Sequence, residues 1–136
     1  VVADKAHAVA VPAWPLPENA VLDTTGAGDS FLGALAAFVA SGKSLLAAAR
    51  DAAKVASWAV AHPGTQPSYA SAAALLDHHH GDALLAASLK HILHGTPMAD
   101  DPLDALRWPL DADASPPDED DLAAAGLTLL VAAKAA

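Results

Sequence analysis

The sequence has no cysteine, few basic residues and few aromatic ones: three Trp, two Phe and one Tyr among 136 residues. Without cysteine, neither a disulfide framework nor a thiolate metal site can form. Seven Lys and Arg against sixteen Asp and Glu give a net charge of −9, which leaves no basic patch for nucleic acid or an anionic membrane. No apolar run approaches the roughly 20 residues that span a bilayer, and no signal-peptide layout opens the chain. These absences favour a cytoplasmic protein that binds neither nucleic acid nor membrane.

One short motif has the residues expected of an anion site. After the extended stretch 20–22 and before an Ala/Leu-rich helical segment, the chain reads Asp23-Thr24-Thr25-Gly26-Ala27-Gly28-Asp29-Ser30-Phe31. Two glycines separated by one small residue let successive backbone N–H groups converge in a tight turn. In the first turn of a helix these donors lack an intrahelical partner, and the helix dipole adds partial positive charge. The motif predicts a phosphate cradle made by the amides of Gly26, Ala27, Gly28 and Asp29.

Asp29 stands at the rim of this cradle, where its carboxylate would repel a phosphate unless it has a chemical role. An acid beside an anion cradle suggests a general base that takes the proton of a hydroxyl as that hydroxyl attacks phosphorus. The alternative is a glycine-containing helix N-terminus with an acidic first turn, which is common in α/β proteins. The choice between the two depends on whether the rest of the motif, with its two aspartates and two threonines, matches a known pattern.

The motif resembles the second signature of the PfkB/ribokinase family of carbohydrate kinases, DTxGAGD followed by a small or hydroxyl residue and Phe. The resemblance implies a ribokinase-like α/β fold, with a mainly parallel sheet flanked by helices. It covers residues 1–76, as the C-terminal, ATP-side part of a kinase domain. It implies transfer of phosphate from ATP, with Mg²⁺, to a sugar hydroxyl, most simply ribose to ribose 5-phosphate. Asp29 would then be both the base and a substrate-binding residue.

A second segment, Gly64-Thr65-Gln66-Pro67-Ser68, also resembles this family, in which the corresponding loop holds a monovalent cation, usually K⁺. The resemblance implies that the cation would be held by oxygens of Asp23, Thr25, Ala59, His62, Gly64 and Ser68. Hard oxygen ligands suit a large, weakly hydrated cation, which could orient the amides of the cradle. The alternative is an ordinary Pro/Gly loop, and the match at residues 23–31 favours the cation site.

The sequence departs from the family at Ala53, where ribokinases have Asn or His near the adenine, so base recognition is expected to be weakened. In the family the sugar contacts other than the base lie upstream of the part that residues 1–76 match. The isolated chain is therefore expected to be an inactive fragment of a kinase. A truncated, non-catalytic nucleotide-binding remnant and a kinase for fructose or a nucleoside remain alternatives, and a homodimer of the full-length protein remains open.

Periodicity and capping residues predict the local structure. We expect extended structure over residues 1–23 with a short strand at Val21-Leu22, helices over 27–41, 44–61 and 82–94, and a loop over 62–68. Gly42-Lys43-Ser44 is similar to the end of a P-loop, but Ala37 stands where that loop needs glycine, so a link between two helices is expected. Residues 77–136 match no family and read as a helical, acidic, Pro/Asp-rich extension, with loop over 97–117. The acidic run 118–121 is either solvated or the start of a last helix, 122–135.

Overall fold

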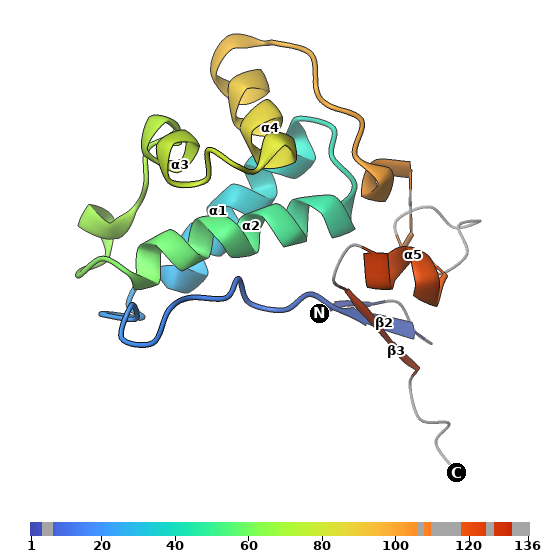
Figure 1. Cartoon of the computed structure of the whole chain (residues 1–136), viewed down its shortest axis with the longest axis horizontal. Helices are drawn as coiled ribbons and strands as arrows, with labels where there is room; N and C mark the ends of the chain where they lie inside the picture. The colour runs from blue at the N-terminus through green and yellow to red at the C-terminus, as the bar shows by residue number, and fades with distance from the viewer. Residues whose placement is uncertain (4–6, 106–107, 110–117, 125–126, 132–136) are drawn as a thin grey trace.

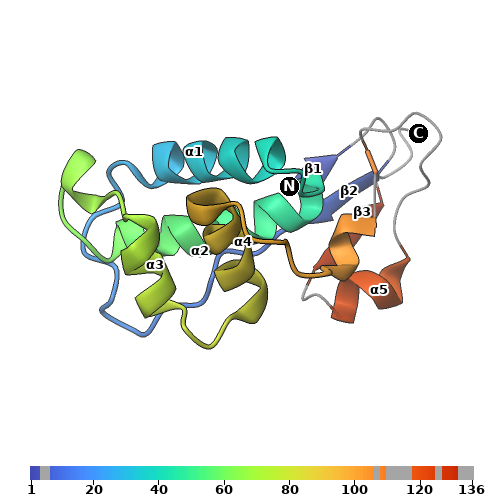
Figure 2. The same cartoon turned by 90° about the horizontal axis from the view of Figure 1, so that it is seen from above.

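A computed structural model describes residues 1–3, 7–105, 108–109, 118–124 and 127–131. The helices α1 and α2 lie side by side, α3 and α4 pack against this pair, and a small sheet with α5 lies at its other end (Figures 1 and 2). In chain order the elements are β1 (Val2–Ala3), β2 (His7–Ala10), α1 (Ala27–Ala40), α2 (Leu45–Val60), the 3₁₀ turn η1 (Gln66–Ser68), α3 (Ala72–His78), α4 (Ala83–His94), the 3₁₀ turn η2 (Pro102–Ala105), α5 (Glu119–Ala124) and β3 (Thr128–Val131).

The two long helices end and begin at the capping residues that the sequence indicates. After α1, Gly42 has a φ of 102°, and the Lys43 amide donates to the Phe38 carbonyl at 3.1 Å. This bond is typical of a helix that closes before a left-handed glycine. Ser44 then precedes α2, and its hydroxyl oxygen accepts the Ala47 amide at 3.2 Å. Both predicted helices and the link between them are confirmed.

α2 is the central element, because it is buried against two clusters of apolar side chains. One cluster joins its first turns to the sheet and to later parts of the chain: Val2, Val9, Leu46, Ala47, Ala49, Leu103, Trp108, Leu122 and Leu127. The other joins it to α1, α3 and α4: Phe38, Ala48, Val55, Leu75, Leu85 and Leu89. Burying one leucine contributes about 1.5–3 kcal/mol, so Leu85 and Leu89 anchor α4 in this second cluster. Stretches on either side of residue 76 thus share both cores, while the domain division at residue 76 stays a prediction.

The sheet among the described residues is antiparallel, unlike the mainly parallel sheet that the resemblance implies. β1 pairs with β2, Val2 lying opposite Val9, and β2 pairs with β3, Val9 lying opposite Leu129. β1 and β2 follow each other closely in sequence, and strands so joined pair antiparallel, since parallel strands need a crossover of a dozen or more residues. The chain is a mixed, helix-rich α and β structure, and its described part contains no parallel pair.

The strand predicted at Val21-Leu22 is wrong. In the structure these residues pair with no strand; instead the amides of Leu22 and Asp23 donate to the Val60 carbonyl, at 2.8 and 3.2 Å. The backbone donors that a neighbouring strand would satisfy are satisfied here by the last carbonyl of α2, which has no partner within the helix. The segment that leads to α1 is therefore fixed to the end of α2.

The C-terminal predictions are mixed. The helix predicted over 82–94 is confirmed as α4, and the loop over 62–68 is confirmed apart from the turn η1. The loop predicted over 97–117 contains η2 and falls partly outside the described residues. A single helix over 122–135 is wrong: α5 begins in the acidic run but ends at Ala124, and β3 follows. The Thr-Leu-Leu-Val run of β3 satisfies its backbone by pairing with β2.

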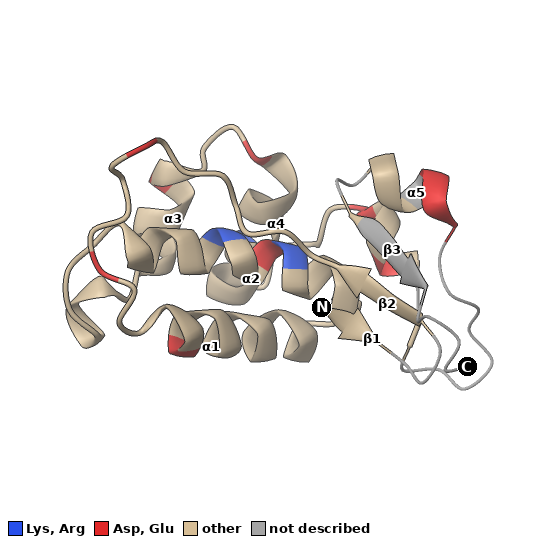
Figure 3. Cartoon of the chain, turned by 90° about the horizontal axis from the view of Figure 1, so that it is seen from below, with Lys and Arg blue, Asp and Glu red and all other residues tan. Residues whose placement is uncertain are grey.

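Charged side chains are buried along α2, where basic residues flank an acidic one (Figure 3). Asp51 is fully buried, and its carboxylate lies 3.3 Å from Lys43 Nζ and 3.2 Å from Lys54 Nζ. Lys43 also lies 3.3 Å from Asp101, which receives hydrogen bonds from Arg50. This buried charge cluster ties α2 to residues just before η2, because breaking it would leave charges without partners in the core.

Candidate active site

The N-terminus of α1 presents open backbone donors. Gly26 precedes the helix with a φ of 82°, a left-handed conformation that glycine adopts without strain, and no side chain caps the helix. Within the described part of the chain, the amides of Gly26, Gly28 and Asp29 donate to no acceptor. The fourth predicted donor, the Ala27 amide, bonds to the Thr24 carbonyl at 3.3 Å. Three of the four amides predicted for the cradle are thus available to an anion.

Gly28 opens onto free space. A Cβ placed on Gly28 would meet no heavy atom within 4 Å, and the residue is exposed, as is Asp29 beside it. The helix dipole adds partial positive charge at this end. The first turn of α1 is therefore open to solvent at Gly28, and its unpaired donors are not covered by a side chain at this point.

Gly26 has the opposite surroundings, because it is packed tightly against the segment after α2. A Cβ on Gly26 would lie 3.1 Å from Cγ2 and 3.2 Å from Cα of Thr65, and 3.3 Å from Cε1 of Tyr69. Only glycine fits both this space and the left-handed φ. The two sequence motifs, residues 23–31 and 64–68, therefore lie against each other.

Asp23 joins the same two motifs. Its Oδ1 accepts the Thr25 amide at 2.9 Å and its Oδ2 accepts the Gly64 amide at 2.9 Å. Hydrogen bonding from the Thr25 side chain and then from the Gly64 and Thr25 amides lowers the pKa of Asp23, so the carboxylate stays ionised. Asp23 acts as a clamp that fixes the loop before α1 to the loop after α2.

The residues predicted to hold a cation are partly assembled by these contacts. Asp23, Thr25 and Gly64 are linked directly, while Ala59 and His62 lie at the end of α2, where the Ala59 carbonyl accepts the His62 amide at 3.1 Å. The hydroxyl of the buried Ser68 donates to the Thr65 carbonyl at 2.6 Å.

The oxygens of this set differ in how free they are. In the described residues, the carbonyls of Thr25, His62 and Gly64 accept no hydrogen bond, whereas Ala59 and Ser68 are engaged. Unpaired carbonyls and a carboxylate are hard oxygen donors, and each keeps acceptor capacity. The donor set fits a monovalent cation in kind.

Tyr69 is a site residue that the sequence did not identify. Its hydroxyl lies 3.5 Å from Asp29 Oδ2, longer than the about 2.5–3.0 Å of a normal O–H···O hydrogen bond, and the side chain is 41% exposed. Burial raises the pKa of Tyr69, and the charge and hydrogen bond of Asp29 raise it further, so the phenol stays protonated at neutral pH. The only sequence signal for Tyr69 was its position directly after Ser68. Tyr69 and Asp29 are forty positions apart in the sequence.

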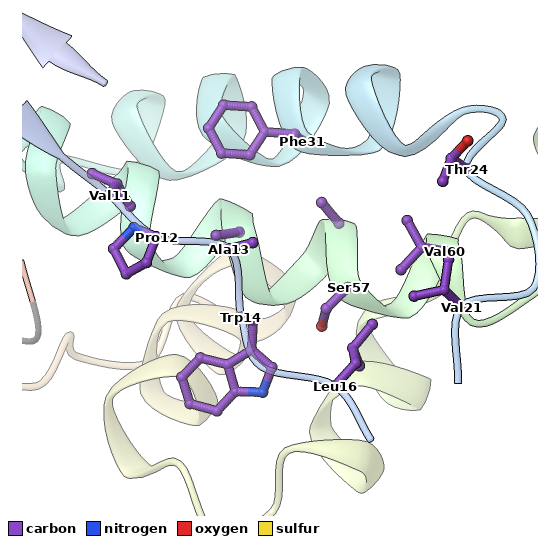
Figure 4. A pocket seen from close by; sticks show the side chains of 12 residues that line it. Val11, Pro12, Ala13, Trp14, Leu16, Val21, Thr24, Phe31, Ser57 and Val60 are labelled. Atoms are coloured by element: carbon purple, nitrogen blue, oxygen red, sulfur yellow. The ribbon is translucent and has the colours of Figure 1, made fainter. Parts of the chain in front are cut away.

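A cavity of about 580 Å³ begins beside Thr24 and runs along α2 (Figure 4). The segment 11–16, with Trp14 and Leu16, forms one wall, and Phe31 of α1 and Ser57 of α2 lie across from it. Ala53 also lines this cavity, but its methyl group offers no hydrogen bond to a base. The cavity is mostly apolar and large enough for the ring system of a nucleotide.

Over the described ranges, no group of three or more His, Cys, Asp or Glu side chains could hold a metal ion. The helices in those ranges are all too short or too polar to cross a membrane.

The sequence was also compared with known proteins. The model of the pfkB family of carbohydrate kinases matches residues 1–72, which is 72 of 136 residues. The match includes the first turn of α1, the clamp residue Asp23 and the loop through Tyr69. No curated protein and no solved structure matches the chain.

Proposed function

The chain belongs to the pfkB family of carbohydrate kinases, and from this premise we propose that it carries the phosphate-binding turn and the base of a sugar kinase. The amides of Gly26, Gly28 and Asp29 would bind the γ-phosphate of ATP, with Ala27 joining them if its weak bond to Thr24 opens. Asp29 would take the proton of the acceptor hydroxyl. The observation that carries this proposal is the uncapped, unfilled first turn of α1 with a carboxylate at its rim.

The proposed reaction needs little from the protein beyond position and charge. The acceptor oxygen forms a bond to the γ-phosphorus while the bond from that phosphorus to the ADP oxygen breaks, and the hydroxyl proton passes to Asp29. Fixed amides stabilise the charge on the transferred group, and each such donor is worth roughly 3–4 kcal/mol in the transition state. Asp29 is solvent-exposed, so a substrate can reach it directly.

The cofactors follow from the family and from the donors present. Kinases of this family use ATP with Mg²⁺, which neutralises phosphate charge when bound, and no side-chain cluster of the described residues is assigned to it. The cavity beside Thr24 would take the nucleoside part of ATP through apolar contact, with Ala53 unable to read the base. K⁺ would bind at Asp23 and the carbonyls of Thr25, His62 and Gly64, with Ala59 and Ser68 completing the set after local rearrangement.

The acceptor is proposed to be a sugar, with ribose as the first candidate. The test is phosphate transfer from ATP to ribose, fructose and a nucleoside by the purified chain and by any longer form of the protein. Asp29→Asn is expected to lower kcat at least about 100-fold, as loss of a general base does, while Asp77→Asn, an exposed acid on α3, leaves kcat unchanged.

The outcomes separate the candidate functions. Transfer to fructose or a nucleoside in preference to ribose would correct the substrate. Binding of ATP with no transfer to any acceptor would show a nucleotide-binding module without catalysis. Near-normal turnover of Asp29→Asn would remove Asp29 as the base.

A further inference from the structure

We infer that Tyr69 is a positioning residue, which holds the Asp29 carboxylate beside the open first turn of α1. The inference rests on the proposed function, because it assigns a partner to the proposed base. The family resemblance and the family match give no role to Tyr69, and the contact is visible only in the folded chain.

Two contacts place Tyr69 over the helix end. Its ring edge packs on Gly26, where a Cβ would come within 3.3 Å of Cε1, and its hydroxyl reaches Asp29 Oδ2 at 3.5 Å. One side chain thus touches both the residue that starts the turn and the carboxylate at its rim. That distance is longer than the about 2.5–3.0 Å of a normal O–H···O hydrogen bond, so the two groups are in contact and a closing movement of about half an ångström would form the bond.

The backbone of Tyr69 is held firmly, so the ring has a fixed base. The Tyr69 amide donates to the Gln66 carbonyl at 3.2 Å, and the preceding residue, Ser68, is fully buried. The same loop is tied to Asp23 through the Gly64 amide. A side chain that leaves a clamped loop can restrain the exposed Asp29, whose own side chain has no other partner in the described residues.

The phenol suits this role chemically. A carboxylate only accepts hydrogen bonds, and a protonated phenol donates one without adding a charge that would compete for phosphate. A phenol is protonated at neutral pH at its ordinary pKa of 10.0, and the pKa of Tyr69 is raised above that value by burial and by Asp29. The hydroxyl would therefore orient one carboxylate oxygen and leave the other free to accept the proton of the substrate.

The experiment is possible because the sequence contains a single tyrosine. Phenolate absorbance against pH titrates Tyr69 alone, with circular dichroism recorded on the same samples to confine the comparison to folded chain. Asp29→Asn should shift the titration of Tyr69 to lower pH, because it removes a negative charge that disfavours phenolate. Asp77→Asn, which removes an equal charge elsewhere, should leave the titration in place.

A second measurement avoids alkaline unfolding. Nitration of the tyrosine ring at mildly alkaline pH follows the phenolate fraction, so Asp29→Asn should nitrate faster than the wild-type chain and Asp77→Asn should not. Equal titration and equal nitration in all three proteins would overturn the inference, even in an active kinase.

Catalysis gives the remaining readout. In a preparation that phosphorylates a sugar, Tyr69→Phe keeps the ring on Gly26 and should lower kcat about 2- to 10-fold, with KM for ATP unchanged. A raised KM at constant kcat would instead make Tyr69 part of the ATP site and would contradict positioning. A chain that binds no ATP, but whose Tyr69 still responds to Asp29→Asn, would contradict the proposed function and leave the Tyr69–Asp29 contact established.

Discussion

The first turns of α1 and α2 lie fewer than twenty residues apart in the sequence, and their backbone donors are treated in opposite ways. α1 starts at Gly26 with no side-chain cap and with open amides at Gly28 and Asp29. α2 starts at Ser44, whose hydroxyl oxygen accepts the Ala47 amide. The turn η2, sixty residues further along the chain, then covers the α2 turn.

That covering is specific. The Ser44 amide donates to Asp104 Oδ1 at 2.8 Å, and the Ser44 hydroxyl donates to the Leu103 carbonyl at 2.6 Å. Beside it lies the buried charge cluster of Lys43, Asp51 and Asp101. A helix end that serves stability has its donors satisfied by the protein, whereas the open end of α1 has donors that only an outside group can satisfy.

The largest effect on stability is expected at Asp51, in the buried charge cluster beside the capped start of α2. Asp51→Ala would remove the carboxylate that Lys43 and Lys54 share, leaving them with Asp101 and Asp82 respectively, and should lower the free energy of unfolding by up to about 3–5 kcal/mol. Urea denaturation followed by circular dichroism measures this change. Asp77→Ala provides the exposed-acid control. A loss below about 1 kcal/mol would show that the buried charge cluster is not a structural centre.

Asp101 should give the next largest effect, and a pH dependence. Burial alone would raise the pKa of Asp101, but hydrogen bonds and charge from Arg50, the Leu103 amide and Lys43 outweigh it, so the pKa is lowered. A carboxyl with a lowered folded pKa stabilises the fold above its unfolded value, and that stability is lost as pH falls through the folded value. Asp101→Asn should cost roughly 1.5–3 kcal/mol at neutral pH.

The same variant should also lose less stability on acidification than the wild type does. Unfolding free energies at neutral pH and below the ordinary Asp value of 3.8 supply the comparison. Parallel acid curves for the two proteins would contradict the assignment. If both proteins lose stability equally as the pH falls, the loss must come from other carboxyls such as Asp82. Burial would raise the pKa of Asp82, but hydrogen bonds from the Leu85 amide and Lys54 lower it.

Ser44→Ala tests the capped helix end. Loss of the side-chain cap should cost about 1–2 kcal/mol, because the Ala47 amide and the Leu103 carbonyl both lose their partner. The midpoint of urea unfolding at unchanged slope is the measurement. A neutral result would mean that water replaces the hydroxyl and that the capped end is no better satisfied than the open one.

Gly28→Ala should have the smallest effect on stability and a clear one on binding. The added Cβ meets no atom, and alanine is the better helix former, so the fold should be stabilised by up to about 1 kcal/mol. The same methyl group would crowd a phosphate at the open turn. Gly33→Ala, also in α1 with free space, is the matched control, and equal ATP affinity in both variants would contradict the cradle.

Local features of this fold could be predicted from sequence, because they depend on neighbours in the chain. Gly42 and Ser44 set the boundary between α1 and α2, and the spacing of Gly26, Gly28 and Asp29 indicated the open turn. Long-range contacts could not be predicted. The bond between Ser44 and Asp104 spans sixty residues and that between Tyr69 and Asp29 spans forty, and both depend on how the helices pack.

The errors have the same origin. The stretch at Val21-Leu22 has a strand-like composition. The amides of Leu22 and Asp23 nevertheless donate to the Val60 carbonyl at the end of α2 and not to a neighbouring strand. The acidic run 118–121 favours a helix that continues through 128–131, but those residues pair with β2 instead. Composition sets a preference, and the partner that tertiary structure brings near determines the outcome.

The most direct test of the central claim is an amide NMR titration of the chain with ATP, with adenosine as the control that lacks phosphate. The account predicts that ATP moves the Gly28 and Asp29 amide resonances saturably, while adenosine leaves them in place and the capped Ala47 amide responds to neither. If ATP leaves Gly28 and Asp29 unmoved, or moves Ala47 equally, the first turn of α1 is not a phosphate site.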